Sequence, residues 1–196
     1  MGCQKSPDEP ASRTGANDLG AQSIATTNKR ADAGRCVKRL SEVPPLAPKN
    51  SPASNCPKDP DGNMMLRVAK VTFPEAKADS KREAGVLSVN VELAETEKAS
   101  ERGLMYRTQM PEESGMLFRL STHSDHTFWM KNTCLSLDMM FIDDDGVIVG
   151  IVENAPTLSE EIQSVGCASR YVLEVNAGWS RRHGVFPGQS VVLPPH

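Results

Sequence analysis

The aromatic residues of this chain lie entirely in its C-terminal part. Every Phe, Tyr and Trp follows residue 62, beginning with Phe73, whereas residues 1–62 hold eight of the fourteen prolines and many Ser, Asn, Asp and Lys residues. Such a segment cannot bury enough apolar surface to offset the entropy of ordering its backbone. We therefore expect residues 1–62 to form a disordered, Pro-rich tether, and residues 63–196 to fold as one domain with a single core.

The pattern after Met64 predicts short strands separated by turns. Apolar residues at every second position from Leu87 to Leu93 are the signature of a half-buried strand. The apolar runs 137–142 and 147–152 flank the turn residues 143–146 and predict a hairpin of two central strands. Further strands are expected at 66–73, 115–120, 126–131, 171–176 and 190–193. Short helices are expected at 96–102, capped by Thr96, and at 177–183, stopped by Gly184.

Many short strands without βαβ spacing favour an antiparallel arrangement. The expected fold class is therefore mainly β, as an antiparallel β-sandwich or barrel-like domain with two short helices. The net charge of −3 comes from interspersed signs, so no basic face for nucleic acid is expected. No run approaches the ~20 apolar residues that span a bilayer. Membrane attachment then requires a lipid.

The first residues, Met1-Gly2-Cys3-Gln4, admit three interpretations. In the first, Cys3 carries the lipid of a bacterial lipoprotein whose signal peptide is cut away or whose true start lies upstream. In the second, Gly2 and Ser6 form a myristoylation pattern with Cys3 as a palmitoylation site, which needs a eukaryotic host. In the third, the start is arbitrary and carries no lipid. We favour the lipoprotein, with the uncharged Gln4 directing it to the outer membrane, facing the periplasm.

The chain has five cysteines, an odd number that leaves one outside any set of pairs. Cys134 follows the predicted strand at 126–131, and Cys167 precedes the strand at 171–176. A Cys134–Cys167 bridge would clamp the loop between them against the sheet. We therefore predict Cys134–Cys167 and Cys36–Cys56 disulfides, with Cys3 left for the lipid.

Four segments resemble one prokaryotic family. They are Arg102-Gly103-Leu104-Met105-Tyr106-Arg107; Phe128-Trp129-Met130-Lys131-Asn132-Thr133 with 137–143; Glu153-Asn154-Ala155-Pro156; and 171–179, ending in Gly178-Trp179. In this order, from about residue 86 to 193, they are similar to the domain of unknown function family number 192. The resemblance implies a small β-sandwich-like domain, frequent in exported bacterial proteins and lipoproteins, with no assigned activity.

The common signatures of nucleotide-binding and hydrolytic enzymes are missing from the chain. Residues 123–126 contain two His and one Asp, but a metal site would need further ligands on a rigid support. Residues 143–146 differ from a calcium loop because the glycine comes too early. We therefore expect no catalytic residue, metal or cofactor.

Polar residues interrupt otherwise apolar strands in the second half of the domain. Because an unpaired buried polar group is costly, such residues are expected to meet each other or a ligand. We predict that six residues share a concavity that binds a ligand: Trp129, Lys131, Asn132, Asn154, Glu174 and Trp179. The structural alternative is that Lys131 lies over Trp129 and pairs with Asp138 or Glu174.

The sequence is compatible with three functions. The first is an envelope protein that acts as a ligand-binding or accessory module, held at the membrane by a lipidated Cys3, with a small molecule or envelope protein as partner. The second is a hydrolase-like or other enzyme that uses the polar group around Lys131, Asp138 and Glu174, with Arg102 and Asn154. The third is a purely structural envelope protein. Nucleic acid is not expected as a partner.

Overall fold

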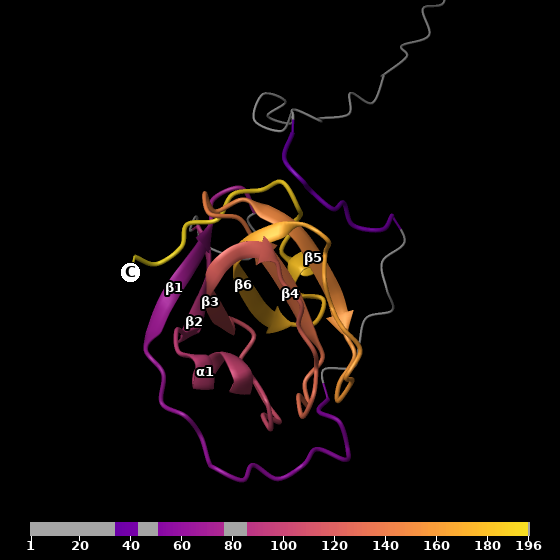
Figure 1. Ribbon diagram of the computed structural model, residues 1–196. Coiled ribbons are helices and arrows are strands. Elements are labelled where there is room, and N and C mark those ends of the chain that lie inside the picture. The colour runs from indigo at the N-terminus through magenta and orange to yellow at the C-terminus, as the bar shows by residue number, and fades with distance from the viewer. Residues whose placement is uncertain (1–33, 43–50, 77–85, 196) are drawn as a thin grey trace, which may run out of the picture. The chain divides into compact units, whose positions relative to one another are not determined.

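A computed structural model describes residues 34–42, 51–76 and 86–195 of the chain. Within these residues the protein is mainly β, with two short helices, as expected (Figure 1). The elements are β1 Val68–Phe73, β2 Leu87–Ala94, α1 Glu97–Arg102, β3 Ser114–Asp125, β4 Leu137–Ile142, β5 Ile148–Ala155, β6 Ala168–Asn176 and α2 Trp179–Arg182. No helix in these ranges is long and apolar enough to cross a membrane.

The strands that the structure describes form one sheet in the order β1-β2-β3-β6-β4-β5. The sheet is mixed, because β2 and β3 run parallel while every other neighbouring pair is antiparallel. The expectation of a wholly antiparallel arrangement is wrong at this one pair. A parallel pair needs a connection that carries the chain back along the sheet. Here α1 and the loop 103–113 provide it, in a βαβ unit that the strand spacing did not reveal.

Local patterns account for several elements. Alternate residues of β2 are buried, as the period of its apolar residues predicts. The β4–β5 turn closes where expected, and Gly146 has a φ of 82°, a conformation that favours glycine. The Thr96 side chain accepts a hydrogen bond of 3.2 Å from the Ala99 N–H and caps α1.

The sheet is buried on both faces. Residues of one face, among them Val89, Met140 and Leu173, form cluster 1 together with Trp179 of α2. Residues of the other face form cluster 2, which includes Phe118, Met139, Phe141 and the loop residues Leu104 and Met130. Every residue of β4 is therefore buried, which explains its continuous apolar run.

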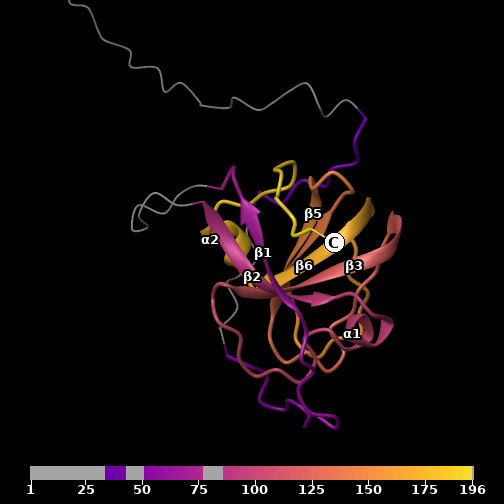
Figure 2. The same cartoon turned by 90° about the vertical axis from the view of Figure 1, so that its left-hand side faces the viewer.

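The C-terminal segment joins the two edges of the sheet. Thr72 of β1 exchanges backbone hydrogen bonds of 3.1 and 2.9 Å with Val192, and Val147 is bridged to Ser190. The segment runs across one end of the strands (Figure 2). The strand expected at 190–193 is thus a pair of isolated bridges, and these give the sheet its barrel-like closure.

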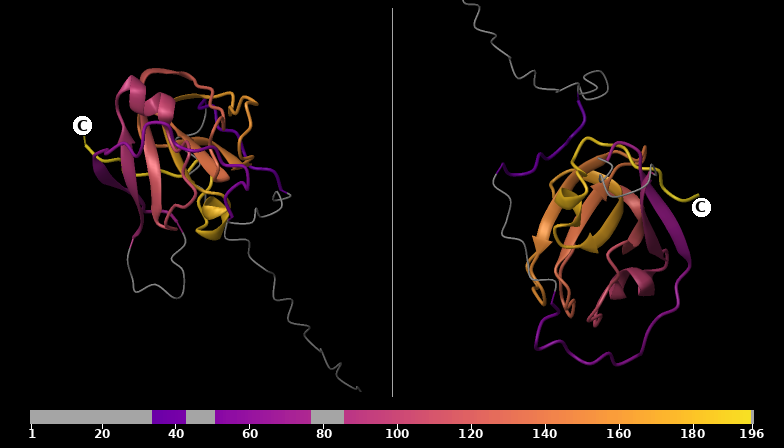
Figure 3. Two further views of the ribbon diagram at one scale, coloured as in Figure 1. Left: turned by 90° about the horizontal axis from the view of Figure 1, so that it is seen from below. Right: turned by 180° about the vertical axis from the view of Figure 1, so that it is seen from behind.

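Two N-terminal segments pack on the domain, so the predicted boundary at residue 62 is wrong. The compact unit begins at Gly34. Residues 34–42 cover the edge of β5, where the Lys38 N–H donates to the Val149 carbonyl at 2.8 Å. This cover buries β5, which is an edge strand and not the central strand that its apolar run predicts. Residues 51–67, here named the strap, pass the opposite end of the sheet from the C-terminal segment (Figure 3). Residues 1–33 lie outside the described ranges.

The disulfides anchor these two segments, and their pairing differs from the prediction. Cys36 is bonded to Cys167 with a Cα–Cα distance of 5.6 Å, and Cys56 to Cys134 with 5.4 Å. The predicted Cys134–Cys167 and Cys36–Cys56 pairs are wrong, because each N-terminal cysteine is held against the domain by backbone contacts near its partner. The Ala53 N–H, for example, donates to the Cys134 carbonyl at 2.9 Å. Cys3 lies outside the described residues.

One predicted strand is absent from the described sheet. Residues 126–131 form only an isolated bridge, in which Phe128 pairs with Gln163. The chain then turns through Asn132, whose φ of 54° does not fit a strand. The aromatic residues that suggested a strand serve packing instead, because the Phe128 ring lies edge-on to Phe118 and Phe141.

Candidate functional site

A polar groove lies between the strap and the loop that follows α1. It has a volume of about 340 Å³, within the range of small-molecule sites. The groove is lined by Asn63 and Met64 of the strap, Glu92 of β2, and Tyr106, Arg107, Thr108 and Gln109 of the loop. Most of these side chains are polar, and their N–H, O–H and carbonyl groups can form hydrogen bonds with a ligand. The arrangement is suited to binding.

The strap wall of the groove is fixed on the N-terminal side of Asn63. The Cys56–Cys134 disulfide holds the strap to the domain. Closer to the groove, the Arg102 guanidinium is ion-paired with Asp59 and donates to the Gly62 carbonyl at 2.9 Å. The hydrogen bond from Arg102 holds the pKa of Asp59 below its usual value.

An ion pair connects the other wall of the groove to the sheet. The Arg107 guanidinium donates two hydrogen bonds to the Glu92 carboxylate, at 2.5 and 2.7 Å. Both side chains are about one-quarter exposed. This bidentate geometry gives the guanidinium and the carboxylate fixed directions in the groove.

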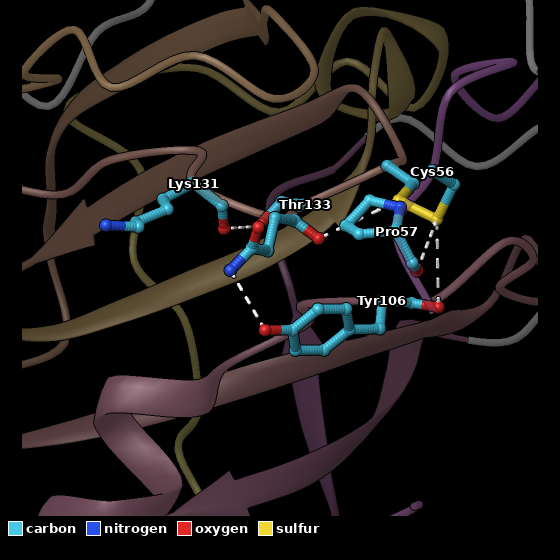
Figure 4. Close-up of a disulfide and its surroundings, with 7 residues drawn as sticks. Cys56, Pro57, Tyr106, Lys131 and Thr133 are labelled. Carbon is cyan, nitrogen blue, oxygen red and sulfur yellow. Dashed lines mark hydrogen bonds between the residues drawn. A yellow bond between two sulfur atoms is a disulfide. The ribbon is translucent and has the colours of Figure 1, made fainter. Parts of the chain in front are cut away.

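Tyr106 and Asn132 lock the two loops beside the groove. Their backbones have positive φ values of 64° and 54°, a conformation that is unfavourable for Tyr106 and better tolerated by Asn132. The Tyr106 N–H donates to the Asn132 carbonyl at 2.8 Å, and the Asn132 amide donates to the Tyr106 hydroxyl at 2.9 Å. Figure 4 shows the Tyr106 ring beside the segment from Lys131 to Thr133, with the Cys56 disulfide near the Tyr106 carbonyl. These contacts compensate the backbone strain and orient Tyr106.

Glu174 is a buried carboxyl close to this region but outside the groove. It lies in one row across the sheet with Glu92, Met116 and Met139, all on the face of cluster 2. Met116 stands between Glu174 and the groove residue Glu92. Burial raises the pKa of Glu174 to about 8, because desolvation penalises the charged form.

Asp138 is a buried carboxylate on the other face of the sheet. It lies opposite Val175 in β6, whereas the next residue, Met139, lies opposite Glu174. The Asp138 oxygens accept hydrogen bonds of 2.9 to 3.0 Å from the backbone N–H groups of Asn154, Gly178 and Ser180. Asp138 therefore joins the end of β5 to the start of α2, which is a structural role.

The structure does not bring the six predicted ligand-binding residues together. Trp179 is fully buried in cluster 1, where its ring centroid lies 5.2 Å from that of Phe73. Asn154 binds Asp138 on that side, whereas Glu174 faces cluster 2. Asn132 contacts the groove through Tyr106. None of the six lines the groove.

Lys131 and Trp129 form a surface pair. The Lys131 ammonium lies 5.2 Å from the centroid of the Trp129 ring, as the structural alternative expected. Its carboxylate neighbour is Glu160 at 3.6 Å, and the expected pairing with Asp138 or Glu174 is wrong. Trp129 remains 47% exposed. Lys131, Asp138 and Glu174 thus do not form the shared polar group on which the enzyme hypothesis depended.

Acidic residues of the β4–β5 turn lie beside His123. Ligand atoms of His123, Asp143 and Asp144 lie within 4.8 Å of one another. Arg35 is ion-paired with Asp143 at 2.6 Å, and Arg170 with Asp144 at 2.8 Å. These guanidinium groups neutralise the carboxylates, so the cluster fits an ion-pair network that docks residues 34–42 on the turn.

The residues of the groove were not among those predicted from the sequence. Tyr106 and Arg107 belong to one of the four family-like segments, which was a usable signal. Apolar periodicity does not reveal, however, that their partners are Glu92 in a strand and Asn132 in a distant loop. The strap residues Asn63 and Met64 stand at the predicted edge of the domain, where no pattern indicates packing.

Comparisons with known proteins agree with the resemblance seen in the sequence. A solved structure from Sinorhizobium meliloti 1021, described as a candidate transcription regulator, is 40% identical; the match covers 67% of this chain and 97% of that one, with a TM-score of 0.59. A protein of unknown function from Novosphingobium aromaticivorans DSM 12444 is 30% identical; the match covers 74% of this chain and 98% of that one, with a TM-score of 0.58. A search of curated proteins returns no match.

The family model agrees with both similarities. Residues 78–193, more than half of the chain, match the model of DUF192, described as "Uncharacterized ACR". The chain therefore belongs to the DUF192 family.

Proposed function

We propose that this protein is a ligand-binding module of the bacterial cell envelope, and that the groove beside Arg107 is its binding site. The observation that carries the proposal is that a disulfide-anchored strap forms one wall of a polar groove. Fixing both walls before a ligand arrives reduces the entropy that binding costs.

The disulfides support an envelope location. Four cysteines form two disulfides, and such bonds persist in the periplasm and other oxidising compartments. The fifth, Cys3, remains the proposed lipid site, with the outer membrane as the proposed destination.

The composition of the groove favours binding over the alternatives. An enzyme would need a free acid or base in the groove, whereas the carboxylate of the lining, Glu92, is ion-paired with Arg107. A purely structural protein would not require the strained backbone of Tyr106 beside the groove. The description of the Sinorhizobium protein as a regulator does not extend to this chain, whose net charge of −3 disfavours DNA.

A comparison of the two disulfides tests the binding role. Thermal shifts are measured with a panel of mono- and disaccharides, amino acids, dipeptides, carboxylates and phosphate. We expect at least one probe to stabilise the oxidised wild type. That shift should be lost in the Cys56→Ser/Cys134→Ser variant, which frees the groove wall, and kept in Cys36→Ser/Cys167→Ser, which frees the other segment. No shift with any probe, or equal shifts in both variants, would contradict the proposed site.

The location is tested in cells that express the protein from its native locus. We expect the protein in the outer-membrane fraction, with a lipid on Cys3 and no other thiol open to alkylation before reduction. A soluble cytoplasmic protein with four free thiols would exclude the envelope role.

A further inference from the structure

The charged residues around the groove are already paired. Arg107 and Glu92 neutralise each other through two hydrogen bonds, and Arg102 is ion-paired with Asp59 and, at 3.5 Å, with Asp61. A charged ligand would have to compete with these internal partners, one of which is bidentate. The groove therefore offers neither a cation nor an anion a site with excess opposite charge.

The paired groups nevertheless suit a hydroxyl group. A guanidinium has five N–H donors, and Glu92 uses two of those of Arg107. The Glu92 carboxylate retains acceptor capacity next to these donors. A hydroxyl can donate to the carboxylate and accept from the guanidinium at once, whereas an ion satisfies only one of the two.

Uncharged hydrogen-bonding side chains complete the lining. Within the described part of the chain, the side chains of Asn63, Thr108 and Gln109 make no hydrogen bond. The Tyr106 hydroxyl accepts a hydrogen bond from the Asn132 amide and can donate one through its own O–H. The lining thus offers both donors and acceptors, and its one cation and one anion, Arg107 and Glu92, cancel in charge.

We propose that the groove binds an uncharged mono- or disaccharide. This inference rests on the proposed function and names its ligand class. The volume of about 340 Å³ is at the lower end of the range for small-molecule sites, which fits one or two sugar rings better than a longer polymer. Met64 and Tyr106 are the lining residues with apolar surface for the C–H groups of a sugar, and the Arg102 guanidinium lies 5.1 Å from the centroid of the Tyr106 ring.

A matched set of sugars tests the ligand class. The oxidised full-length protein is titrated with N-acetylglucosamine, its cationic analogue glucosamine, anionic glucuronate, and the neutral disaccharides maltose and N,N′-diacetylchitobiose, and amide resonances are followed by NMR. We expect the neutral sugars to move the resonances of the strap and of residues 106–109, and the two charged sugars to have no effect at equal concentration.

Two exposed residues of the lining provide variants that retain the fold. Thr108→Ala and Gln109→Ala should each weaken the binding of the neutral sugars by roughly 5-fold, the effect of one hydrogen bond. Gln163→Ala, the same change outside the groove, is the control and should leave the affinity unchanged.

The outcomes separate this inference from the proposed function. If a charged sugar or another member of the panel binds at residues 106–109 and the neutral sugars do not, the ligand class is wrong and the binding site stands. If no probe perturbs the groove, both are wrong. If neutral sugars bind elsewhere, or if the two groove variants bind as tightly as the control, the saccharide site is overturned.

Discussion

At the residue scale, two buried carboxyl groups in the central strands of the sheet have opposite surroundings, one polar and one apolar. Asp138 receives three backbone N–H groups on the face of cluster 1. Glu174 faces the apolar residues of cluster 2, where burial raises its pKa to about 8. The two residues therefore predict different responses to the loss of charge.

The raised pKa of Glu174 predicts that the free energy of unfolding decreases as the pH rises. Its folded pKa of about 8 exceeds the usual 4.5, so between these values the folded protein retains a proton that the unfolded chain has released. Its contribution to stability is complete below about pH 4.5 and declines as the pH rises through 8, by up to about 1.4 kcal/mol per pH unit. Glu174→Gln keeps the neutral form and should be the more stable protein at pH 8.

Urea unfolding near pH 5, 6.5 and 8 measures this difference. The wild type and Glu174→Gln should converge at the lowest pH and diverge at the highest. Glu161→Gln, at an exposed position, should follow the wild type throughout. A constant difference between wild type and Glu174→Gln would refute a proton-linked effect.

Asp138→Asn should destabilise the fold by about 2 to 4 kcal/mol. The new amide has one acceptor oxygen, and its NH₂ group would face a backbone N–H that now donates to Asp138. Asp61→Asn, whose side chain is 69% exposed, should change stability by less than about 0.5 kcal/mol. Equal losses in the two variants, measured by chemical denaturation, would show that the Asp138 contacts contribute little.

At the element scale, the C-terminal segment determines whether the sheet has open edges. Val191 is buried in cluster 1, and its N–H donates to the Gly146 carbonyl at 2.8 Å. The next residue, Val192, pairs with β1 through its backbone but leaves its side chain 58% exposed. Val191 thus contributes side-chain packing, whereas Val192 contributes backbone pairing at the edge of the sheet. Substituting each valine tests the two contributions separately.

Val191→Ala should lower the free energy of unfolding by about 2 kcal/mol, because two buried methyl groups are removed. Val192→Ala should cost less than about 0.5 kcal/mol, since its backbone bonds to Thr72 are kept. Amide exchange at Thr72 should become faster in Val191→Ala alone. Similar exchange in both variants would indicate that the segment does not close the sheet.

At the scale of the whole molecule, the disulfides connect the N-terminal segments to the sheet. They close long loops, with sequence separations of 131 for Cys36–Cys167 and 78 for Cys56–Cys134. Restraining long loops in the unfolded chain stabilises the folded state relative to it.

Removing either disulfide by paired Cys→Ser substitution should cost about 4 to 5 kcal/mol by loop-closure entropy. In the Cys56→Ser/Cys134→Ser variant, limited proteolysis should cut the strap faster than it does in the wild type. Peptide mapping without reduction checks the pairing itself, and recovery of a Cys134–Cys167 peptide would refute it.

The sequence by itself determined the elements that depend on near neighbours. The alternation from Leu87 to Leu93, the apolar run of β4, the turn at Gly146 and the Thr96 cap are local patterns, and the structure confirms each of them. The mainly β class follows from these elements, and family membership from the four ordered segments.

Only the tertiary structure decided the features that depend on distant partners. Cysteine spacing cannot show that residues 34–42 and the strap pack on the domain, so it led to the wrong pairs. Polar residues in apolar strands indicated costly burial, but not that Asp138 and Glu174 face opposite sides of the sheet. The groove joins Glu92, Arg107 and the strap from three separate parts of the chain. Contacts of this kind arise when the sheet assembles, because no short segment contains both of their partners.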